Sequence, residues 1–403
     1  MHRRHFLAST AALAASHAAV RPASANDTIT VACIGTGGRC RRLMQSLNQI
    51  KGVKMVAVCD VWDQHLHLGK ELADKNAVAV KDYRALLDRK DIDAVLIGSP
   101  DHWHVPMTVD ACDAGKDVYV EKPLTHDLSE GDKVIAAQNR NKRIVQVGTQ
   151  QRSMPHLIEA RAIVQSGQLG RIHKIHLTWN RNRPRWDSGK LAIDPQTVDW
   201  KKFLGNAPEQ PFDAYRFRNW RWFWDFGGGI FTDLMVHWID TAYWMLDMDH
   251  PATALSIGDH FRTKNLWQTP DTVQTLLHYP KNQLQAYFEG TFVNRRNRAM
   301  LEIMGEHATL YVDRGRYELH PELDNGVKPR TRIDGKGERG QDFFQEVDGE
   351  LYHLQNWVEC MRSRQTPACP AEEGVRAAAA AHLANLALRG GGLAKWQDHV
   401  RAK

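Results

Sequence analysis

The sequence predicts an α/β protein in two parts. A doubly wound parallel sheet comes first, and helices with antiparallel strands follow. Between Thr28 and Gly148, short β-branched apolar runs alternate with helical stretches, which is typical of βαβ units around a sheet buried on both faces. After about Gln150, the strand-like runs alternate apolar and polar residues, which is typical of antiparallel strands with one solvated face.

The first part contains five predicted strands separated by predicted helices. The strands are Thr28–Ile34, Lys54–Cys59, Ala94–Gly98, Val118–Val120 and Ile144–Val147. The helical stretches between them include His65–Asp74, Val105–Ala114 and Ser129–Asn139.

The second part opens with a helix over Pro155–Ser166 and a strand over Ile172–Trp179. A polar, tryptophan-rich stretch from Asn180 to Phe226 precedes a helix from about Ile230 to Leu246. The predicted antiparallel strands are Thr272–Tyr279, Leu284–Thr291, Ala299–Met304 and Thr309–Val312. The remaining segments are a polar loop over Lys328–Gly340 and two closing helices near Leu351–Arg362 and Glu373–Leu388.

Residues 1–25 have the order of a twin-arginine export signal. A pair at Arg3-Arg4 precedes an alanine-rich apolar stretch, and Ala23-Ser24-Ala25 offers a small-residue cleavage site. We therefore expect twin-arginine export to the periplasm; the alternative is a basic tail on a cytoplasmic enzyme. Because three positive charges lie in this segment, the formal charge of +6 falls to +3 after cleavage. That surplus is too small to argue for a nucleic-acid partner, and no run of 18 apolar residues predicts a membrane span after processing.

The six cysteines form no CxxC pair, and several lie in apolar strand-like runs. This pattern predicts buried thiols rather than a disulfide framework or a zinc site. The histidine pairs His65/His67 and His102/His104 are spaced i, i+2, which does not suit a helical metal site. We therefore predict no metal.

A glycine-rich turn follows the first predicted strand and opens a helix. Gly35 permits the tight turn, Gly37 lets a pyrophosphate approach the backbone, and free N–H groups at the helix start face the phosphates. The third position of this fingerprint is Cys40, a small residue in place of glycine or alanine. Asp60 ends the second strand, where a carboxylate binds ribose hydroxyls and repels a 2′-phosphate. We therefore expect residues 26–150 to form a Rossmann domain that binds NAD rather than NADP; the alternative is an ordinary glycine turn beside a surface aspartate. The expected contacts in these segments are Gly35, Gly37, Gly38, Arg39 and Asp60.

Further motifs give a family resemblance over essentially the whole mature chain. They are Gly98-Ser99-Pro100-Asp101-His102-Trp103-His104, Glu121-Lys122-Pro123, Gly148-Thr149-Gln150, and Gly227-Gly228-Gly229 followed by Asp233 and His237. The chain resembles the glucose–fructose oxidoreductase / inositol dehydrogenase / MocA (Gfo/Idh/MocA) family, and the segment Asn219–Gly229 resembles an exported subgroup. The resemblance implies a second α/β domain, residues 151–403, built on an open, mostly antiparallel sheet. It also implies a substrate between the domains and a homodimer or homotetramer formed through the outer face of that sheet. The C-terminal helices are expected to be able to pack back on the Rossmann domain.

Three residues match the family's catalytic triad by resemblance: Lys122, Asp233 and His237. On a helix, Asp233 and His237 lie one above the other, and Asp240 continues the stripe. Lys122 follows the predicted strand Val118–Val120, at the edge where parallel sheets bind ligands. We interpret His237 as the general base, Lys122 as alkoxide stabiliser or proton relay, and Asp233 as a substrate ligand. Taken alone, the Asp-x-x-x-His pair would indicate a surface pair on a helix.

Other candidate contacts surround this triad. The remaining expected cofactor contacts are Ser99, Pro100, His104, Glu121 and Gln150, and the expected substrate contacts are Arg152, Trp220, Arg221 and Asp225. His104 could instead cap a helix. The alternation over residues 220–225 suggests an extended segment whose aromatic faces suit sugar rings; the alternative is a tryptophan-rich core plug.

These features predict an NAD-dependent oxidoreductase that acts on a hydroxyl of a small carbohydrate or cyclitol. Because the periplasm is not expected to recycle NAD, export argues for a tightly bound cofactor and a redox-neutral cycle. One such cycle oxidises one sugar and reduces another. The alternative function is an NAD-dependent glycoside hydrolase that oxidises the sugar transiently, eliminates the substituent, adds water and returns the hydride. A non-catalytic ligand sensor is a third hypothesis.

Overall fold

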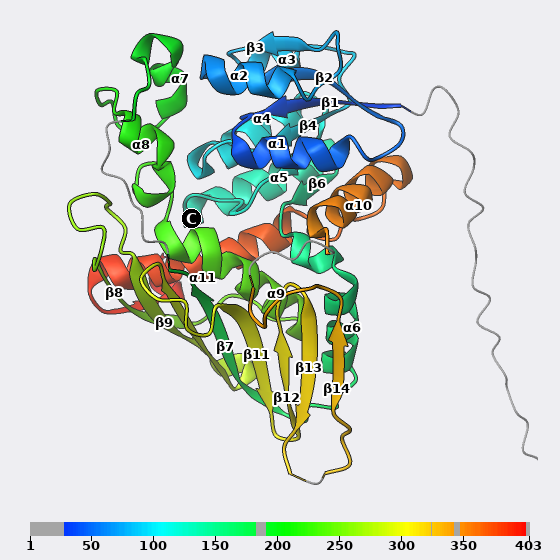
Figure 1. The fold of residues 1–403 in the computed structure, drawn as a ribbon, viewed down its shortest axis with the longest axis vertical. Helices are drawn as coiled ribbons and strands as arrows, with labels where there is room; N and C mark the ends of the chain where they lie inside the picture. Colours follow the sequence, from blue (N-terminus) through cyan, green and yellow to red (C-terminus); the bar gives the residue numbers. More distant parts are fainter. Residues whose placement is uncertain (1–27, 183–190, 324, 342–346, 400–403) are drawn as a thin grey trace, which may run out of the picture.

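The computed structural model describes residues 28–182, 191–323, 325–341 and 347–399, so the export signal proposed for residues 1–25 lies outside the described residues. The described chain contains two sheets, one above the other in Figure 1. The upper sheet is parallel, and the lower one is mostly antiparallel. The predicted α/β class is thereby confirmed.

The first sheet has the strand order β3-β2-β1-β4-β5-β6, and all of its strands are parallel. This is the Rossmann order, in which the chain reverses direction between β1 and β4 and leaves a crevice there. Its strands are β1 (Ile29–Ile34), β2 (Val53–Cys59), β3 (Val78–Val80), β4 (Ala94–Ile97), β5 (Asp117–Val120) and β6 (Val145–Val147). Its helices are α1 (Gly38–Leu47), α2 (Asp63–Lys70), α3 (Arg84–Leu87), α4 (His104–Asp113) and α5 (Gly131–Asn141).

The second sheet has nine described strands in the order β14-β13-β12-β11-β7-β10-β9-β8-β15. Only the central β7–β10 pair is parallel among those described. The strands are β7 (Ile172–Asn180), β8 (Thr253–Asp259), β9 (Thr272–Tyr279), β10 (Leu284–Thr291), β11 (Ala299–Gly305), β12 (Ala308–Val312), β13 (Arg316–Pro321), β14 (Arg330–Ile333) and β15 (Leu393–Lys395).

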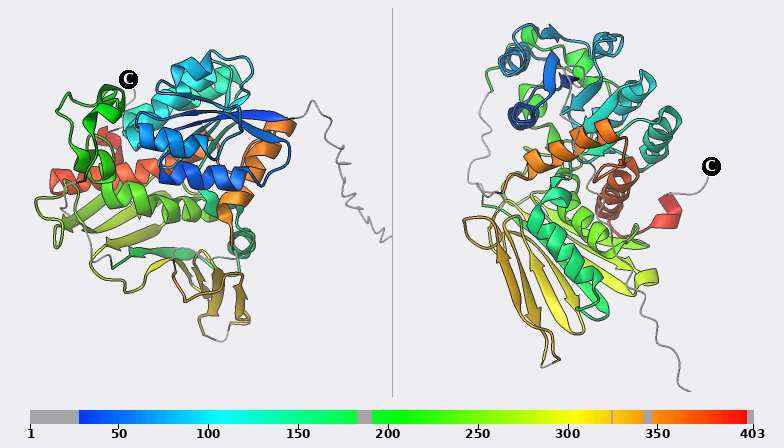
Figure 2. Two further views of the ribbon diagram at one scale, coloured as in Figure 1. Left: turned by 45° about the horizontal axis from the view of Figure 1, so that its top comes forward. Right: turned by 90° about the vertical axis from the view of Figure 1, so that its right-hand side faces the viewer.

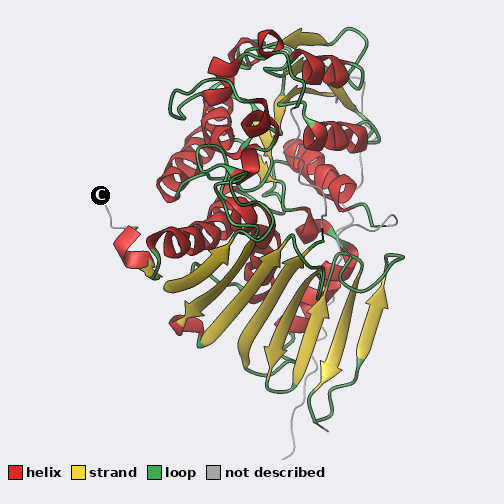
Figure 3. Ribbon diagram, turned by 60° about the vertical axis from the view of Figure 1, so that its left-hand side comes forward, coloured by secondary structure: helices red, strands yellow, loops and turns green. Residues whose placement is uncertain are grey.

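Helices cover one face of this second sheet, as Figure 3 shows from the side. Large side chains such as Trp238, Phe288 and Leu301 fill the space between the helices and the strands. The helices of this part are α6 (Pro155–Gln165), α7 (Trp200–Leu204), α8 (Ala214–Arg218), α9 (Val236–Leu246), α10 (Gly349–Ser363), α11 (Ala371–Gly390) and α12 (Trp396–His399).

Helix α10 packs against the Rossmann sheet although it lies late in the sequence (Figure 2). Its residues Leu354 and Trp357 share one buried cluster with Leu43 of α1 and Val31 of β1. The amino-terminal end of α11 joins a second Rossmann cluster through Ala371. The two sheets are therefore tied together by the last long helices of the chain.

The segment Lys328–Gly340, predicted to be a loop, contains the strand β14, so that prediction is wrong at its centre. Strand β14 is an edge strand with the sequence Arg-Thr-Arg-Ile and no fully buried residue, so it lacks the apolar alternation that marks a strand. The six cysteines, by contrast, are all buried free thiols, as predicted.

Candidate active site

A groove at the carboxyl edge of the Rossmann sheet has the form of a dinucleotide site. Gly35 has a φ of +75°, and a Cβ there would lie 2.6 Å from the backbone nitrogen of Ser99. A side chain at Gly38, the first residue of α1, would meet nothing within 4 Å, so the helix start is open. This cavity has a volume of about 280 Å³. The predicted cofactor residues that line it are Gly35, Gly37, Gly38, Arg39, Asp60, Ser99 and Pro100.

Two polar side chains in this groove fit a bound dinucleotide. The Ser99 hydroxyl is buried and has no hydrogen-bond partner among the described residues. Asp60 follows β2, and its Oδ1 accepts a hydrogen bond from the Trp62 backbone at 2.9 Å. The other carboxylate oxygen, Oδ2, lies 3.6 Å from His65 Nδ1 at the groove wall. This is where the ribose of an adenosine half binds in Rossmann domains.

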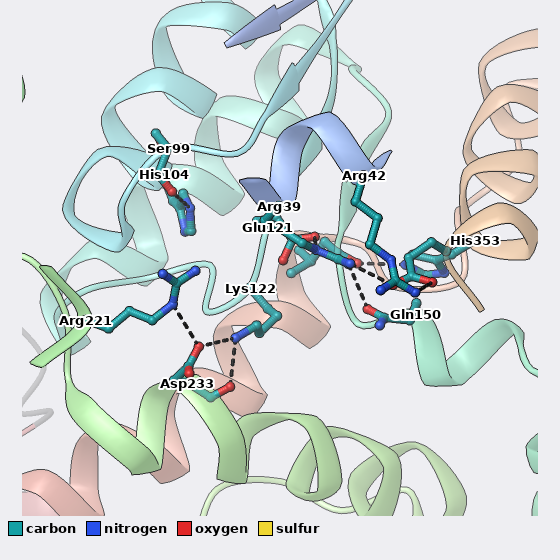
Figure 4. Close-up of polar contacts among 12 residues, drawn as sticks. Arg39, Arg42, Ser99, His104, Glu121, Lys122, Gln150, Arg221, Asp233 and His353 are labelled. Carbon is teal, nitrogen blue, oxygen red and sulfur yellow. Dashed lines mark hydrogen bonds and ion pairs between the residues drawn. The ribbon is translucent and has the colours of Figure 1, made fainter. Parts of the chain in front are cut away.

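Arg39 lines both the groove and the neighbouring cleft, and Figure 4 shows its polar contacts. Its guanidinium donates to Glu121 Oε1 at 2.8 Å, to Glu350 Oε1 at 2.8 Å and to Gln150 Oε1 at 3.2 Å. Burial lowers the pKa of Arg39, but the two carboxylates outweigh it and raise that pKa. Glu121 and Gln150, predicted to contact the cofactor, thus hold Arg39 and line the cleft rather than the groove. Glu350 was not predicted, because α10 carries no motif that points to a site.

Lys122, Asp233 and His237 meet in a cleft of about 350 Å³ beside the groove. The Lys122 ammonium donates to Asp233 Oδ1 at 2.9 Å and to the Asp233 carbonyl at 2.7 Å (Figure 4). Lys122 follows β5, whereas Asp233 and His237 come from the helix after the triple glycine. The structure therefore brings together the three residues that were predicted to be catalytic.

The helix that carries Asp233 and His237 begins as a π-helix over Phe231–Met235 and continues as α9. Such wide turns are frequent at functional sites. Asp240, the next residue of the Asp/His stripe, does not line the cleft, because it is fully buried against Arg152. Its turn of the helix faces α11 and the loop after β6 instead of the cavity.

Two charged partners keep Asp233 ionised. Burial raises the pKa of Asp233, but Lys122 and Arg221 outweigh burial, so that pKa lies well below its ordinary value. Arg221 Nε lies 3.3 Å from the same carboxylate oxygen that Lys122 binds. A fixed anion between two cations orients the ammonium group toward the cavity.

His237 is a neutral imidazole. Burial, followed by the positive charge of Lys122, lowers its pKa well below the ordinary value. Its Nδ1 is buried without a hydrogen-bond partner in the described residues, and its ring packs on Trp179 with centroids 5.1 Å apart. A neutral, unengaged imidazole can accept a proton.

His104 begins α4 behind this cleft. Its Nδ1 lies 2.7 Å from the Pro123 carbonyl and its Nε2 lies 2.9 Å from the Ser99 carbonyl. Burial lowers its pKa to about 4. Because both ring nitrogens contact backbone, His104 positions the loops after β4 and β5, and the residue lines the cleft.

The tryptophan-rich segment is not the extended strand that its alternation suggested. Trp220–Trp222 form a 3₁₀ turn, and Trp220 and Arg221 line both the groove and the cleft. Asp225, predicted to bind substrate, pairs instead with Arg216 at 2.7 Å and lies outside both cavities. The 3₁₀ turn determines which side chains face the cleft. The alternation of residue types along the sequence does not reveal this turn.

Arg152 is a second predicted substrate contact that the structure places elsewhere. It forms a buried ion pair with Asp240 at 2.7 Å and a further contact with Glu373 at 3.0 Å. With a side chain only 3% exposed, Arg152 lines neither cavity. Its charge ties the loop after β6 to α9 and α11.

Residues 199–222, here called the strap, leave the second sheet and lie against the Rossmann groove (Figure 1). The Phe203 carbonyl accepts hydrogen bonds from His102 Nε2 and Trp103 Nε1, both at 2.8 Å. Arg218 lies 3.1 Å from His65 and covers the Trp62 ring. The strap residues that line the groove are Lys202, Phe203, Phe217, Arg218, Trp220 and Arg221.

Asp101 was not singled out from the sequence, although it lies within a quoted motif. It follows β4, is 5% exposed and lines the cleft beside Lys122. Within the described residues, no group of three or more His, Cys, Asp or Glu side chains is arranged to hold a metal ion. No described helix has the length and apolarity needed to cross a membrane.

Comparisons with known proteins bear on both parts of the chain. An uncharacterized oxidoreductase, YrbE, of Bacillus subtilis is 32% identical over 220 residues, 54% of each chain. The inositol 2-dehydrogenase of Salmonella typhimurium is 33% identical over 138 residues, 33% of this chain and 40% of the relative. The α-N-acetylgalactosaminidase of Shewanella oneidensis is 31% identical over 174 residues, 36% of this chain and 38% of the relative. The chain thus spans about half or less of these curated relatives.

Solved structures share the fold over nearly the whole chain. A levoglucosan dehydrogenase in complex with NADH and levoglucosan superposes with a TM-score of 0.70 and 16% identity, covering 91% of this chain and 99% of that one. A myo-inositol 2-dehydrogenase of Lactobacillus plantarum gives a TM-score of 0.67 at 22% identity, covering 91% and 99%.

Two family models match successive parts of the chain. Residues 29–149 match the oxidoreductase family with an NAD-binding Rossmann fold, and residues 157–311 match the GFO/IDH/MocA C-terminal domain. Together they span more than half of the chain. With the Rossmann order, the open glycine turn and the Lys122–Asp233 pair in place, the chain belongs to the Gfo/Idh/MocA oxidoreductase family.

Proposed function

We propose that the protein is an NAD-dependent oxidoreductase that transfers a hydride between a carbohydrate or cyclitol hydroxyl and the nicotinamide. The observation that carries the proposal is the convergence of Lys122, Asp233 and His237 in a cleft that shares lining residues with the dinucleotide groove. A substrate in that cleft would contact both the catalytic side chains and the nicotinamide end of a bound cofactor.

Each of the three side chains has a separate role in the alcohol oxidation. When bound, the nicotinamide supplies the hydride acceptor or donor. His237 accepts the hydroxyl proton, because its imidazole is neutral and unengaged. Lys122, held by Asp233 at 2.9 Å, stabilises the negative charge that develops on the substrate oxygen. Asp233 thus orients Lys122, and its carboxylate can also accept a hydrogen bond from a substrate hydroxyl.

The test is turnover with a defined panel of polyols. The purified protein is mixed with NAD and myo-inositol, D-glucose or levoglucosan, and the absorbance of reduced nicotinamide is followed. We expect at least one polyol to be oxidised with equimolar reduced cofactor. The proposal would be contradicted if the protein neither oxidised any polyol of the panel nor reduced added sugar ketones.

We also propose that NAD is preferred and tightly held. Asp60 faces the position of the adenosine ribose, where its negative charge disfavours a 2′-phosphate. The strap supports tight binding, since it places Phe203, Phe217 and Arg218 over the groove from outside the Rossmann sheet. A cofactor under the strap would have to displace these contacts before it could leave.

A second candidate is glycoside cleavage through transient oxidation, elimination, addition of water and re-reduction. The similarity to the α-N-acetylgalactosaminidase of Shewanella oneidensis favours it, and so does the argument that an exported enzyme needs a redox-neutral cycle. The discriminating assay uses p-nitrophenyl N-acetyl-α-galactosaminide. Release of nitrophenol without net reduced cofactor supports hydrolysis, and stoichiometric reduced cofactor with a simple polyol supports the dehydrogenase.

We further propose twin-arginine export to the periplasm, on the order of the Arg3-Arg4 pair, the apolar stretch and the Ala23-Ser24-Ala25 site. Replacing both arginines with lysine should leave the precursor in the cytoplasm. Secretion of the double-lysine variant at the normal level would contradict this route.

A homodimer or homotetramer is the proposed assembly. Exposed apolar side chains form a row across the outer face of the second sheet, with Leu393 paired beside Leu255 and Leu255 beside Leu276. Leu255, Leu276 and Leu393 are 46%, 54% and 56% exposed, which is costly in a monomer. Light scattering should give a multimer that Leu276→Glu weakens; a monomeric wild type would contradict the assembly.

A further inference from the structure

Asp101 is a buried carboxyl group that the proposed mechanism does not use. It begins a short 3₁₀ turn, Asp101–Trp103, directly after β4. Strand β4 lies next to β1, so Asp101 lies at the crevice where the strand order reverses. In open parallel sheets this crevice is where ligands bind.

The surroundings of Asp101 leave its carboxyl group available to a ligand. Asp101 lines the cleft together with Lys122, Asp233 and His237, and only 5% of the residue is exposed. Lys122 donates its hydrogen bonds to Asp233, and Arg221 donates a hydrogen bond to the same residue. The Asp101 carboxyl makes no hydrogen bond or ion pair with any described residue. Its oxygens are therefore left for a ligand in the cleft, which they can bind by hydrogen bonds.

We propose that the Asp101 carboxyl binds a hydroxyl group of the substrate, adjacent to the carbon that is oxidised. The inference rests on the proposed function and names the substrate class more narrowly: a polyol with neighbouring hydroxyls, one held by Lys122 and His237 and the next by Asp101. The geometric basis is that all three side chains line one cavity and that Asp101 alone among them is both acidic and unpaired.

The charges around Asp101 indicate whether the hydroxyl group is bound by the neutral acid or by the carboxylate. Burial raises its pKa well above the ordinary value; Lys122 and Arg221 lower it in part, and Asp233 and Glu121 raise it further. The net shift favours the neutral acid over the carboxylate. A neutral carboxyl both donates and accepts a hydrogen bond, which matches a hydroxyl group.

Two substitutions separate this role from a structural one. Asp101→Ala removes both hydrogen-bonding atoms, whereas Asp101→Asn keeps a neutral group of the same shape that donates and accepts. Asp113→Asn is the matched control, since Asp113 lies on the far end of α4 and pairs with Arg140 at 2.6 Å. Each variant is assayed for KM and kcat with the best polyol of myo-inositol, D-glucose and levoglucosan, and for NAD affinity by equilibrium dialysis.

A binding measurement accompanies the kinetics. Trp179, Trp220 and Trp222 line the cleft, so their fluorescence reports occupancy by the polyol in the NAD-loaded protein. We expect Asp101→Ala to raise both the polyol Kd and KM about tenfold, with kcat and NAD affinity changed less than about threefold. Asp101→Asn should restore the polyol Kd to within about threefold of wild type.

The outcomes that overturn the inference differ from those that overturn the function. Unchanged polyol affinity in Asp101→Ala, a loss confined to kcat, a loss of NAD affinity, or an Asp101→Asn variant as weak as Asp101→Ala would each overturn the role of Asp101 while wild-type turnover stands. A wild type that neither binds nor oxidises any of the three polyols would overturn both.

Discussion

At the scale of single residues, the state of His237 depends on its neighbours. Burial first, and then the charges of Lys122 and Arg314, lower its pKa well below the value of 6.5 for an ordinary histidine. A base with a depressed pKa stays neutral when the pH falls through 6.5, and it gains its proton only at lower pH. The proton-accepting form therefore predominates over the whole neutral range.

The first prediction concerns this pH dependence. We expect kcat/KM for polyol oxidation to show no acid limb near pH 6.5 and to fall only at clearly lower pH. His237→Asn should lower kcat by about 100-fold or more while NAD stays bound, because only the proton acceptor is lost. An acid limb centred at pH 6.5 that persists in His237→Asn would assign the base to another residue.

We propose that a second residue, Asp60, determines the choice between NAD and NADP. Asp60→Ala removes the carboxylate that repels a 2′-phosphate, and it leaves the basic side chains Lys81, Arg84 and Lys202 in the groove. The ratio of NADP to NAD in kcat/KM should rise about tenfold or more. The comparison requires steady-state assays with both cofactors on cofactor-free protein. An unchanged ratio would contradict the placement of the ribose at Asp60.

At the scale of elements, the strap has the largest predicted effect on cofactor exchange. Lys202 and Arg218 line the groove from the strap, whereas the neighbouring Lys201 is exposed and does not. The Lys202→Ala/Arg218→Ala variant should release bound NAD about tenfold faster, and Lys201→Ala should match wild type. The measurement is the loss of NAD from preloaded protein after dilution. Equal release from all three proteins would show that the strap does not retain the cofactor.

The helices and strands also show which parts of the fold could be predicted from the sequence. Five of the six Rossmann strands and the glycine turn could be predicted because a sheet buried on both faces requires continuous apolar runs, and because a tight turn requires Gly35. Lys122, Asp233 and His237 could be identified because a family motif surrounds each of them. The edge strand β3, which has no buried residue, was not predicted, and neither were β8 and β13. The strap was not predicted either, because its short helices depend on contacts with Trp62 and Trp103 from elsewhere in the chain.

Substrate contacts were the least predictable part of the site. Arg152 and Asp225 are polar residues near site motifs, yet each forms an ion pair away from the cavity. Asp101 contributes to the cleft because the β4 turn leaves it buried and unpaired. Whether such a side chain lines the cavity depends on the ion pairs that it forms. These pairs depend on long-range geometry, which a local sequence pattern does not encode.

At the scale of the whole molecule, buried histidines link stability to pH. The pKa values of His104, His353 and His382 are lowered to about 4, in each case chiefly by burial. The unfolded chain binds protons at these sites near pH 6.5, and the folded chain does not until about pH 4. Stability is therefore complete above pH 6.5 and is lost as the pH falls toward 4.

The corresponding prediction is acid sensitivity. Between pH 7 and pH 5 the free energy of unfolding should fall by several kcal/mol, because each such histidine contributes up to about 1.4 kcal/mol per pH unit in this window. Urea denaturation at the two pH values, with and without NAD, measures the change. Equal midpoints and slopes at pH 7 and pH 5 would contradict the neutral state of these side chains.

We expect Lys122 to act on the substrate in the cleft that shares lining residues with the dinucleotide groove. The most direct test is a single-turnover experiment with NAD-loaded protein and a saturating polyol substrate, in which reduced-nicotinamide absorbance is followed after mixing. We expect rapid reduction in the wild type and, in Lys122→Ala, reduction at least about 100-fold slower with the cofactor still fully bound. Reduction at the same rate in both proteins would contradict it.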